Sequence, residues 1–296
     1  MVYFERMEVR NMKKITWIGT GVMGKPMAYH LADAGYEVTV YNRTYEKALT
    51  MQDKTTVAKT IPEAVKDADV VFTIVGFPQD VEEIYLGDNG ILNNVKENAI
   101  VVDMTTSSPE LAIKIYEEAL KKNIQSLDSP VTGGDLGAIN ATLSIMVGGN
   151  EEIFNKVLPL LEVLGKQVTY MGKAGNGQFA KLANQICIAG AIASTAEALS
   201  FAKVNGLDET SFLEVVNNGS AASWQSTNMG PKMINEDYDP GFFIKHLIKD
   251  LRLSQAVGEE GSLPISKQVL SQYEQLLEQG YGDLGTQAIS KYYKSK

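Results

Sequence analysis

Three polar residues interrupt one of the most apolar stretches of this chain. Lys181, Asn184 and Gln185 lie near the start of a segment rich in Ala, Ile and Leu, which runs from Gln178 to about Lys203. Helical spacings of three and four residues put these polar side chains on one face. A lysine on a buried helix needs a partner or a polar cavity, and desolvation makes lysine suitable for proton transfer. The pattern therefore indicates either a reacting lysine in a cleft or a lysine that snorkels to solvent.

A glycine-rich turn follows the first strand-like run, which begins at Lys13. Its residues are Gly19, Thr20, Gly21, Val22, Met23 and Gly24. This spacing between a strand and a helix is typical of a dinucleotide-binding turn. We expect Gly19 to permit a sharp reversal, Gly21 to let the backbone approach a pyrophosphate, and Gly24 to permit close packing of the helix. The pyrophosphate would lie at the helix N-terminus, where free N–H groups favour an anion.

The residues after the next strand-like run, Glu37–Tyr41, indicate which nicotinamide cofactor is preferred. An acidic residue about 20 positions past the glycines usually binds the ribose 2′-hydroxyl of NAD. Here the position holds Asn42, followed by Arg43 and Thr44. Because a guanidinium can donate two parallel hydrogen bonds to a phosphate, we predict NADP as the preferred cofactor and NAD as the second choice. The alternative is that Arg43 is an ordinary solvated loop residue.

The elements that must position these residues fall into two groups. From Lys13 to about Gly172, strand-like and helical stretches alternate, and apolar runs such as Val70–Val75 suit a parallel sheet buried on both faces. Beyond that point only helical patterns follow. The sequence therefore predicts an α/β fold with a Rossmann-like, doubly wound domain over residues 12–174. An all-helical domain over residues 175–296 would follow, joined by a long central helix. Its later helices are expected at Glu209–Val216, Trp224–Ile234, Leu247–Val257 and Ile265–Gln279.

Composition and charge exclude several functional classes. The net charge of -9 over 296 residues argues against a nucleic-acid partner. The longest apolar run, Leu182 to Ala196, is too short to span a bilayer, so no membrane partner is expected. The single cysteine, Cys187, excludes an intrachain disulfide and fits a cytoplasmic protein, and we expect a buried, inert thiol. No cluster of His, Cys and carboxylates has metal-ligand spacing, so no metal is predicted. Residues 1–11 look like an upstream extension.

A turn with hydroxyls and adjacent glycines follows a later strand. Its sequence is Asp128-Ser129-Pro130-Val131-Thr132-Gly133-Gly134-Asp135. Backbone N–H groups in such a turn can cradle a carboxylate. A plain turn has the same composition, so the residues alone leave both interpretations open.

Four motifs together resemble the β-hydroxyacid dehydrogenase family, which includes 3-hydroxyisobutyrate dehydrogenase, tartronate semialdehyde reductase and glyoxylate/succinic semialdehyde reductases. They occur in the family's order, cover nearly the whole chain from Met12, and comprise Gly19–Gly24 with Pro26–Ala28, Asp128–Gly134, Gly175–Gln185 and Lys249–Leu251. Two positions depart from the usual pattern. Thr20 replaces a leucine, and Thr132 stands where serine is commoner.

The resemblance implies a reaction and a role for each matching residue. Lys181 would be the catalytic lysine in hydride transfer between NADP(H) and a small 3-hydroxy acid or its semialdehyde. The carboxylate-bearing substrate would be held by Ser129, Thr132, Gly133, Gly134, Asn184 and Gln185. Beyond the glycine turn, the cofactor would contact Gly76, Phe77 and Pro78 on the adenosine side, and Thr105, Thr106 and Lys249 around the nicotinamide. The family's helical domains also imply a homodimer or homotetramer.

Two other functions share this architecture. An imine reductase is one, although such enzymes generally carry a different residue at the position of Lys181. A non-catalytic NADP(H)-binding redox sensor is the other. A decarboxylating 6-phosphogluconate dehydrogenase is disfavoured because that enzyme is much longer. We expect a structural role for His246, three residues before Lys249, and an ordinary helical role for His30.

Overall fold

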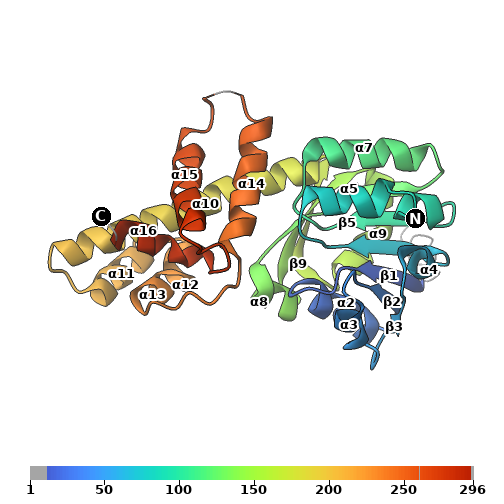
Figure 1. Ribbon diagram of the computed structural model, residues 1–296, viewed down its shortest axis with the longest axis horizontal. Coiled ribbons are helices and arrows are strands. Elements are labelled where there is room, and N and C mark those ends of the chain that lie inside the picture. The colour runs from blue at the N-terminus through green and yellow to red at the C-terminus, as the bar shows by residue number, and fades with distance from the viewer. Residues whose placement is uncertain (1–11, 260, 295–296) are drawn as a thin grey trace. The chain divides into compact units, whose positions relative to one another are not determined.

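The computed structural model describes residues 12–259 and 261–294. The chain divides into two compact units between Lys181 and Leu182, and this division falls within a long helix (Figure 1). The residue pattern predicts a boundary between residues 174 and 175, seven residues earlier in the chain. The difference arises because the first residues of that helix are hydrogen-bonded into the α/β unit.

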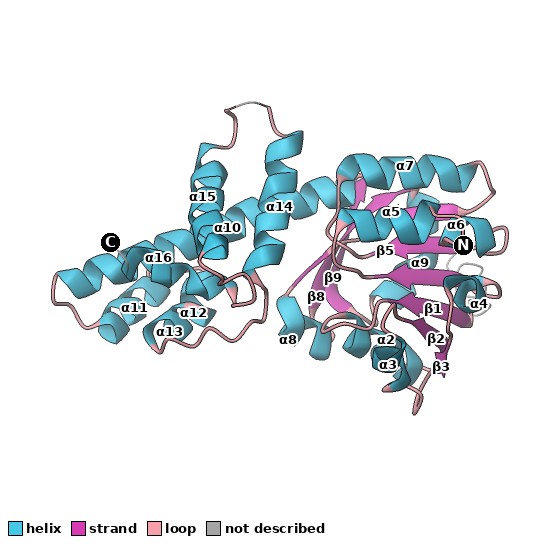
Figure 2. Cartoon of the chain, viewed as in Figure 1, coloured by secondary structure: helices cyan, strands magenta, loops and turns pink. Residues whose placement is uncertain are grey.

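The first unit is built on a nine-stranded sheet in the described part of the chain, with strand order β3-β2-β1-β4-β5-β6-β8-β7 and β9 paired to β8. Strands β1 to β6 pair in parallel, whereas β8 runs antiparallel to β6 and β7 and parallel to β9. All the named strands lie in this unit (Figure 2). Their bounds are β1 (Lys14–Ile18), β2 (Glu37–Tyr41), β3 (Thr56–Val57), β4 (Val70–Thr73), β5 (Ile100–Asp103), β6 (Gln125–Asp128), β7 (Val131–Thr132), β8 (Leu143–Gly149) and β9 (Gly165–Gly172).

The strand order reverses direction between β1 and β4, which makes this point a topological switch point of the sheet. From β1 the chain proceeds outward through β2 and β3, and it then returns to the other side of β1 with β4. In doubly wound sheets, ligands bind at such a switch point. The predicted glycine turn after β1 and the predicted Gly76–Pro78 segment after β4 therefore lie at the edge where a dinucleotide is expected.

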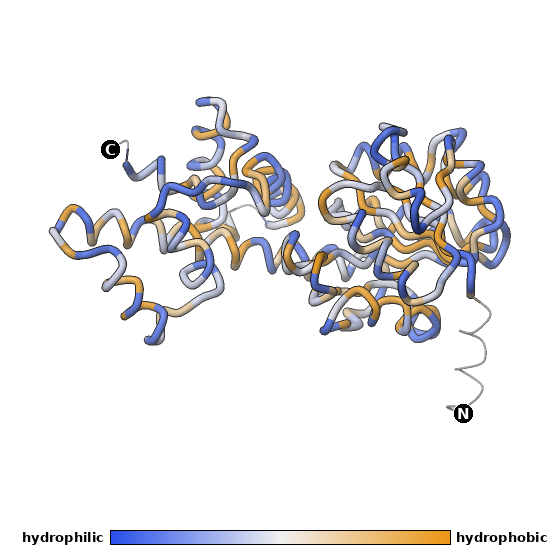
Figure 3. The backbone as a smooth tube through the Cα atoms, turned by 90° about the horizontal axis from the view of Figure 1, so that it is seen from below, coloured by the Kyte–Doolittle hydropathy of each residue, from blue (hydrophilic) through white to orange (hydrophobic). Residues whose placement is uncertain are grey.

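Helices cover both faces of the sheet because alternate strand residues point to opposite sides. Val70 and Phe72 of β4 belong to the core on one face, and Val71 belongs to the core on the other. The middle strands are hydrophobic along their length (Figure 3). The first face is covered by α2 (Gly24–Asp33), α3 (Tyr45–Leu49), α8 (Gly134–Ile139) and α9 (Glu151–Leu161). The second is covered by α4 (Ile61–Val65), α5 (Pro78–Leu86), α6 (Ile91–Asn94) and α7 (Pro109–Leu120).

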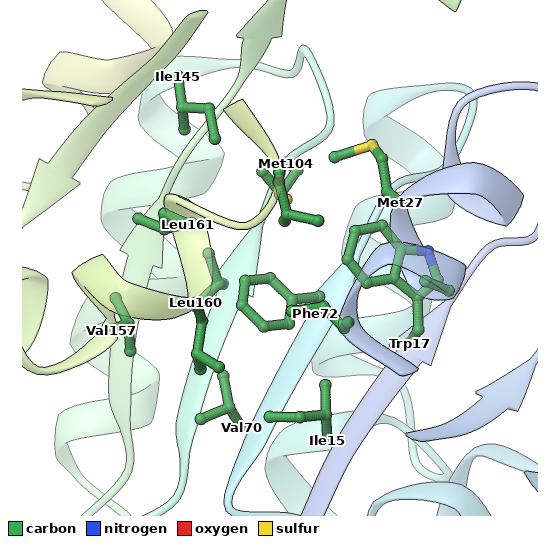
Figure 4. Close-up of a cluster of buried hydrophobic side chains, with 14 of the residues drawn as sticks. Ile15, Trp17, Met27, Val70, Phe72, Met104, Ile145, Val157, Leu160 and Leu161 are labelled. Carbon is green, nitrogen blue, oxygen red and sulfur yellow. The ribbon is translucent and has the colours of Figure 1, made fainter. Parts of the chain in front are cut away.

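Large buried side chains fill the first of these cores (Figure 4). Trp17 of β1 stacks on Phe72 of β4 with ring centroids 5.4 Å apart. Met27 of α2 and Leu160 of α9 complete the layer above the strands. The indole N–H of Trp17 donates to the carbonyl oxygen of Gly19 at 3.0 Å, so the core also fixes the start of the glycine turn.

The second unit contains helices and one isolated bridge between Phe243 and Gly285 in its described residues. The stretch Trp224–Ile234, expected as one helix, is two short helices separated at Met229, because Pro231 lacks an N–H and starts a new helix. The helices are α10 (Asn176–Val204), α11 (Glu209–Asn218), α12 (Trp224–Asn228), α13 (Gly230–Ile234), α14 (Ile244–Val257), α15 (Pro264–Glu278), η1 (Thr286–Ile289) and α16 (Ser290–Lys294).

The long central helix α10 corrects two expectations. The apolar run was expected to be too short to span a bilayer, but the helix continues past the charged residues at both ends of that run. By length and composition α10 could therefore cross a membrane. Buried helices of protein cores can have the same length and composition. Of its most apolar 18-residue window, 44% is buried inside the protein. Cys187 was expected to be buried but is exposed. Apolar and small residues surround this helix, and packing covers only some of its faces, so apolarity alone did not indicate which face is buried.

Candidate active site

The glycine turn between β1 and α2 has the backbone that close approach requires. Gly19 adopts φ +97°, and a Cβ there would clash with the carbonyl oxygen of Ile74. A Cβ at Gly24 would clash with the carbonyl oxygen of Gly19. A Cβ at Gly21, in contrast, would meet no other atom within 4 Å. The first and third glycines are therefore needed for packing, whereas the second borders open space, as suits a backbone that approaches a pyrophosphate.

The segment after β2 is tied to this turn. Asn42 accepts a hydrogen bond from the Thr20 N–H at 3.1 Å through its side-chain oxygen and donates to the carbonyl oxygen of Thr44 at 2.9 Å. The buried Thr20 hydroxyl has no hydrogen-bond partner within the described chain. Asn42 therefore fixes the two loops together, a role that its position in the sequence does not predict.

Arg43 is accessible but already has an anionic partner. Its side chain is 80% exposed, and its guanidinium lies 2.9 Å from Asp80 Oδ1. The other oxygen of Asp80 accepts from the Phe77 N–H at 3.0 Å, so this carboxylate also caps α5. Sequence reasoning missed Asp80, which lies 37 residues from Arg43. Its position in the first turn of a helix directly after Gly76-Phe77-Pro78 was the available signal.

Thr105 is held between the carboxyl ends of β4 and β5. Its hydroxyl accepts from the Val75 N–H at 3.0 Å, and its own N–H donates to Asp103 Oδ1 at 3.0 Å. Asp103 also accepts from the Thr73 hydroxyl at 2.8 Å, and Thr73 is paired with the Tyr85 hydroxyl at 2.9 Å. A buried network of Thr73, Tyr85 and Asp103 therefore fixes the loop that contains Thr105 and the adjacent Thr106.

Asp103 titrates within the physiological range. Its carboxyl has a pKa raised to about 6, mainly by burial and to a smaller extent by the nearby Asp128. Hydrogen bonds from Thr105 and Thr73 act in the opposite direction and lower this pKa. Desolvation is the largest influence, so the charged form of Asp103 is less favoured here than it is in water.

The predicted carboxylate-binding turn has two consecutive glycines in the left-handed region. Gly133 has φ +134° and Gly134 has φ +65°, and a Cβ at Gly134 would meet nothing within 4 Å. Thr132 ends β7, and α8 starts directly at Gly134. Ser129 is fully buried, and its hydroxyl has no hydrogen-bond partner among the described residues. Backbone amides next to open space can bind a carboxylate, so the geometry suits the predicted role.

Two helices of this unit are joined beside that turn. His30 Nε2 lies 3.0 Å from the carbonyl oxygens of both Ala138 and Ile139. Because a carbonyl only accepts, Nε2 must carry the proton. His30 therefore links α2, which follows the glycine turn, to α8, which follows the Gly133–Gly134 turn.

Lys181 lies in the second turn of α10 and is only 6% exposed. The helix begins against the carboxyl end of β6, where Asp128 Oδ1 accepts from the Gly175 N–H and Oδ2 from the Gln178 N–H, both at 2.8 Å. A Cβ at Gly177 would lie 2.6 Å from the carbonyl oxygen of Met146, so this glycine permits close contact with β8. Burial makes a lysine useful for proton transfer when the helix that carries it is fixed.

The helical unit holds the remaining predicted residues around one buried acid. Gln185 donates to Asp250 Oδ2 at 2.7 Å, and Asn184 donates to Gln185 at 3.0 Å. Lys249 Nζ lies 3.2 Å from Asp250 Oδ1. Asp250 lies within the motif Lys249–Leu251, which does not by itself indicate a role for this residue. Its position next to Lys249 was the only signal.

His246 packs against aromatic rings in the same unit. Its ring centroid lies 6.3 Å from that of Phe242 and 5.7 Å from that of Phe243. Burial lowers the pKa of His246, and the nearby Lys249 lowers it further. These contacts fit the predicted structural role. Among the described residues, no group of three or more His, Cys, Asp or Glu side chains could hold a metal ion.

Comparison with known proteins identifies the family. Residues 14–172 match a family model described as the NAD binding domain of 6-phosphogluconate dehydrogenase. Residues 175–293 match one described as the NAD-binding of NADP-dependent 3-hydroxyisobutyrate dehydrogenase. The 3-hydroxyisobutyrate dehydrogenase-like protein 1 of Arabidopsis thaliana is 45% identical over 93% of this chain and 84% of its own. The NAD-dependent L-serine dehydrogenase of Pseudomonas aeruginosa is 34% identical over 95% of this chain and 98% of its own.

A solved structure extends the similarity to the whole fold. The 3-hydroxyisobutyrate dehydrogenase of Mycobacterium tuberculosis, solved with L-serine, has a TM-score of 0.86 at 29% identity, covering 95% of this chain and 98% of that one. The chain therefore belongs to the β-hydroxyacid dehydrogenase family, and it is an NAD(P)-dependent oxidoreductase that acts on a CH–OH group. The predicted fold class and family resemblance are confirmed.

Replacement of two glycines should separate folding from cofactor binding. Gly24→Ala should lower the free energy of unfolding by about 1–3 kcal/mol, because the added methyl clashes with the turn backbone. Gly21→Ala should leave stability within about 0.5 kcal/mol but weaken NADPH binding roughly tenfold or more. Urea unfolding and fluorescence titration measure the two effects. Unchanged NADPH affinity in Gly21→Ala would contradict the assignment of this turn to the pyrophosphate.

Asp103→Asn should change the pH dependence of stability. The folded pKa of Asp103 is raised above the value near 3.9 of an unfolded aspartate, so wild-type stability falls as pH rises from about 4 to 6. The free energy of unfolding of the wild-type protein, relative to that of Asp103→Asn, should fall by roughly 2–3 kcal/mol between about pH 4 and pH 6. Above about pH 6 this difference should stay constant. Urea unfolding at a series of pH values tests this. Parallel stability curves for the two proteins would show that Asp103 does not titrate there.

Proposed function

We propose that the protein catalyses reversible hydride transfer between NADP(H) and a small 3-hydroxy acid or its semialdehyde, with Lys181 as the general acid and base. The observation that carries this proposal is the burial of Lys181 in a helix whose first turn is hydrogen-bonded to the carboxyl end of β6. The ligand-binding edge of a doubly wound sheet lies at the same end of the strands.

The protein's residues would bind, orient and transfer a proton. The nicotinamide, when bound, supplies or accepts the hydride. In reduction, Lys181 would donate a proton to the developing alkoxide and stabilise its negative charge, and in oxidation the neutral amine would accept the hydroxyl proton. The amides at Gly133 and Gly134 would bind the substrate carboxylate, which fixes the reacting carbon relative to the cofactor.

The substrate class we propose includes L-serine, which is itself a 3-hydroxy acid. The similarity to a serine dehydrogenase and to a dehydrogenase solved with L-serine supports its inclusion. The direct test is NADPH oxidation with methylmalonate, succinate and tartronate semialdehydes and glyoxylate, and NADP⁺ reduction with 3-hydroxyisobutyrate and L-serine. Parallel assays use NADH and NAD⁺. Binding of NADPH without turnover of any of these compounds contradicts the proposal and favours an imine reductase or a redox sensor.

We also propose a homodimer or homotetramer formed through the helical unit. Several large apolar side chains of that unit are more than half exposed in the single chain: Phe201, Val204, Leu207, Val215, Trp224 and Ile265. Exposed large apolar side chains can take part in an association surface. They support self-association, which would bury them.

Lys181→Met should reduce turnover without a matching loss of cofactor affinity. Methionine keeps the length of the side chain but cannot transfer a proton, so kcat should fall about 10²–10⁴-fold. The dissociation constant for NADPH should change less than about threefold, since the amine is assigned to the substrate. Steady-state kinetics and fluorescence titration measure these values. Lys166→Met, at an exposed position of β9, is the control. Equal losses of turnover and NADPH affinity would argue against the catalytic role.

Cofactor preference should depend on both Arg43 and Asp80. Arg43→Ala should weaken NADPH binding by about 10–100-fold and change NADH binding little, because only NADPH offers a phosphate to the guanidinium. Asp80→Asn should shift preference further toward NADPH, because it removes the competing negative charge and keeps an acceptor for the Phe77 N–H. Titration of each variant with both cofactors measures the preference. Arg252→Ala, which breaks an exposed pair with Glu274, is the control. Equal weakening of both cofactors in Arg43→Ala would refute the phosphate role.

A further inference from the structure

The side-chain amide of Gln178 joins two segments that are far apart in the sequence. Gln178 is fully buried in the first turn of α10. Its side-chain oxygen accepts from the Ser107 N–H at 2.9 Å, and its side-chain nitrogen donates to the carbonyl oxygen of Thr105 at 2.8 Å. The two bonds lie on either side of Thr106. One side chain therefore holds the backbone of the loop after β5.

The same residue is fixed through its backbone. The Gln178 N–H donates to Asp128 Oδ2, and the Gly175 N–H donates to Asp128 Oδ1. Asp128 thus satisfies two N–H groups at the start of α10, where a helix has no acceptors of its own. With its backbone held by β6 and its side chain holding the β5 loop, Gln178 has little freedom to move relative to either strand end.

Gln178 also lies one helical turn before Lys181. Residues three apart on a helix are neighbours on the same face. Any shift of the first turn of α10 relative to the Thr105–Ser107 loop therefore shifts the lysine relative to that loop. An apolar side chain of the same size could fill the space but would leave the buried Ser107 N–H and Thr105 carbonyl without these partners.

We propose that Gln178 is a positioning residue of the reaction, because it holds the Thr105–Ser107 loop at a fixed spacing from the helix that carries Lys181. This inference rests on the proposed function, in which that loop borders the nicotinamide and Lys181 transfers the proton. Hydride and proton transfer need both groups at the same substrate carbon, so a loss of this spacing lowers the rate of the chemical step more than it lowers binding.

The test compares Gln178→Met with a matched variant. Gln287 is an equally buried glutamine in the helical unit, and it donates to the carbonyl oxygens of Asp237 and Asp239 at 3.0 Å each. Both Gln→Met changes remove the two side-chain hydrogen bonds of a buried glutamine and nearly keep the side-chain volume. Gln178→Met should lower kcat by about 10–100-fold, with NADPH affinity within threefold of wild type, while Gln287→Met lowers only the thermal midpoint.

A third variant provides a pH readout that a purely structural role would not produce. In Gln178→Glu the ionised carboxylate faces the Thr105 carbonyl oxygen and repels it, whereas the protonated carboxyl can donate to it again. The kcat of Gln178→Glu relative to wild type should therefore rise as pH falls, and that of Gln178→Met should stay constant.

The outcomes separate this inference from the proposed function. Wild-type turnover that collapses in Lys181→Met supports the function, and a normal kcat in folded Gln178→Met then overturns the positioning role alone. A Gln178→Glu profile parallel to that of wild type also overturns it. Absence of turnover in the wild-type protein, or normal turnover in Lys181→Met, overturns the proposed function and this inference with it.

Discussion

The candidate site depends on hydrogen bonding of backbone groups at the carboxyl edge of the sheet, where β5 and β6 end and irregular segments begin. An unpaired buried N–H costs about 1–3 kcal/mol, so each of these groups needs an acceptor from elsewhere. Asp103 accepts from the Thr105 N–H, and Asp128 accepts from two N–H groups at the start of α10. These carboxylates replace the regular ladder at the point where the chain must leave it, and they determine where the site's loops lie.

Two buried acids on adjacent strands are electrostatically unfavourable. Asp103 and Asp128 are buried and paired in the register of β5 and β6, and the charge of Asp128 raises the pKa of Asp103. Burial raises the pKa of Asp128 as well, while backbone N–H groups of Gly175 and Gln178 lower it. Neutral amides could accept fewer hydrogen bonds in the same volume. The acids therefore favour one arrangement of the loops at the expense of stability near neutral pH.

Features set by local spacing could be predicted from the sequence. The glycine turn, the alternation of strands and helices and the long helix all follow from patterns within about 20 residues. The contacts of Gln178 with Ser107 could not be predicted, because they join positions 71 residues apart and depend on which strands are neighbours. The exposure of Cys187 could not be predicted either, because the sequence of an apolar helix does not show which of its faces is packed. The break between α12 and α13 does have a signal in the sequence, because a proline such as Pro231 is typical of the first turn of a new helix.

The pairing of Arg43 with Asp80 limits what one residue can indicate about the cofactor. A 2′-phosphate offers Arg43 more charge and more acceptors than a carboxylate does, so it can replace Asp80 as the partner. Asp80 stays nearby because it caps the Phe77 N–H, and its negative charge then opposes the phosphate. The proposed preference for NADP(H) therefore depends on two opposing charges, that of the exposed Arg43 side chain and that of Asp80 in the first turn of α5. Discrimination of this kind can change through one loop residue while the glycine turn, the sheet and the helix with Lys181 stay the same.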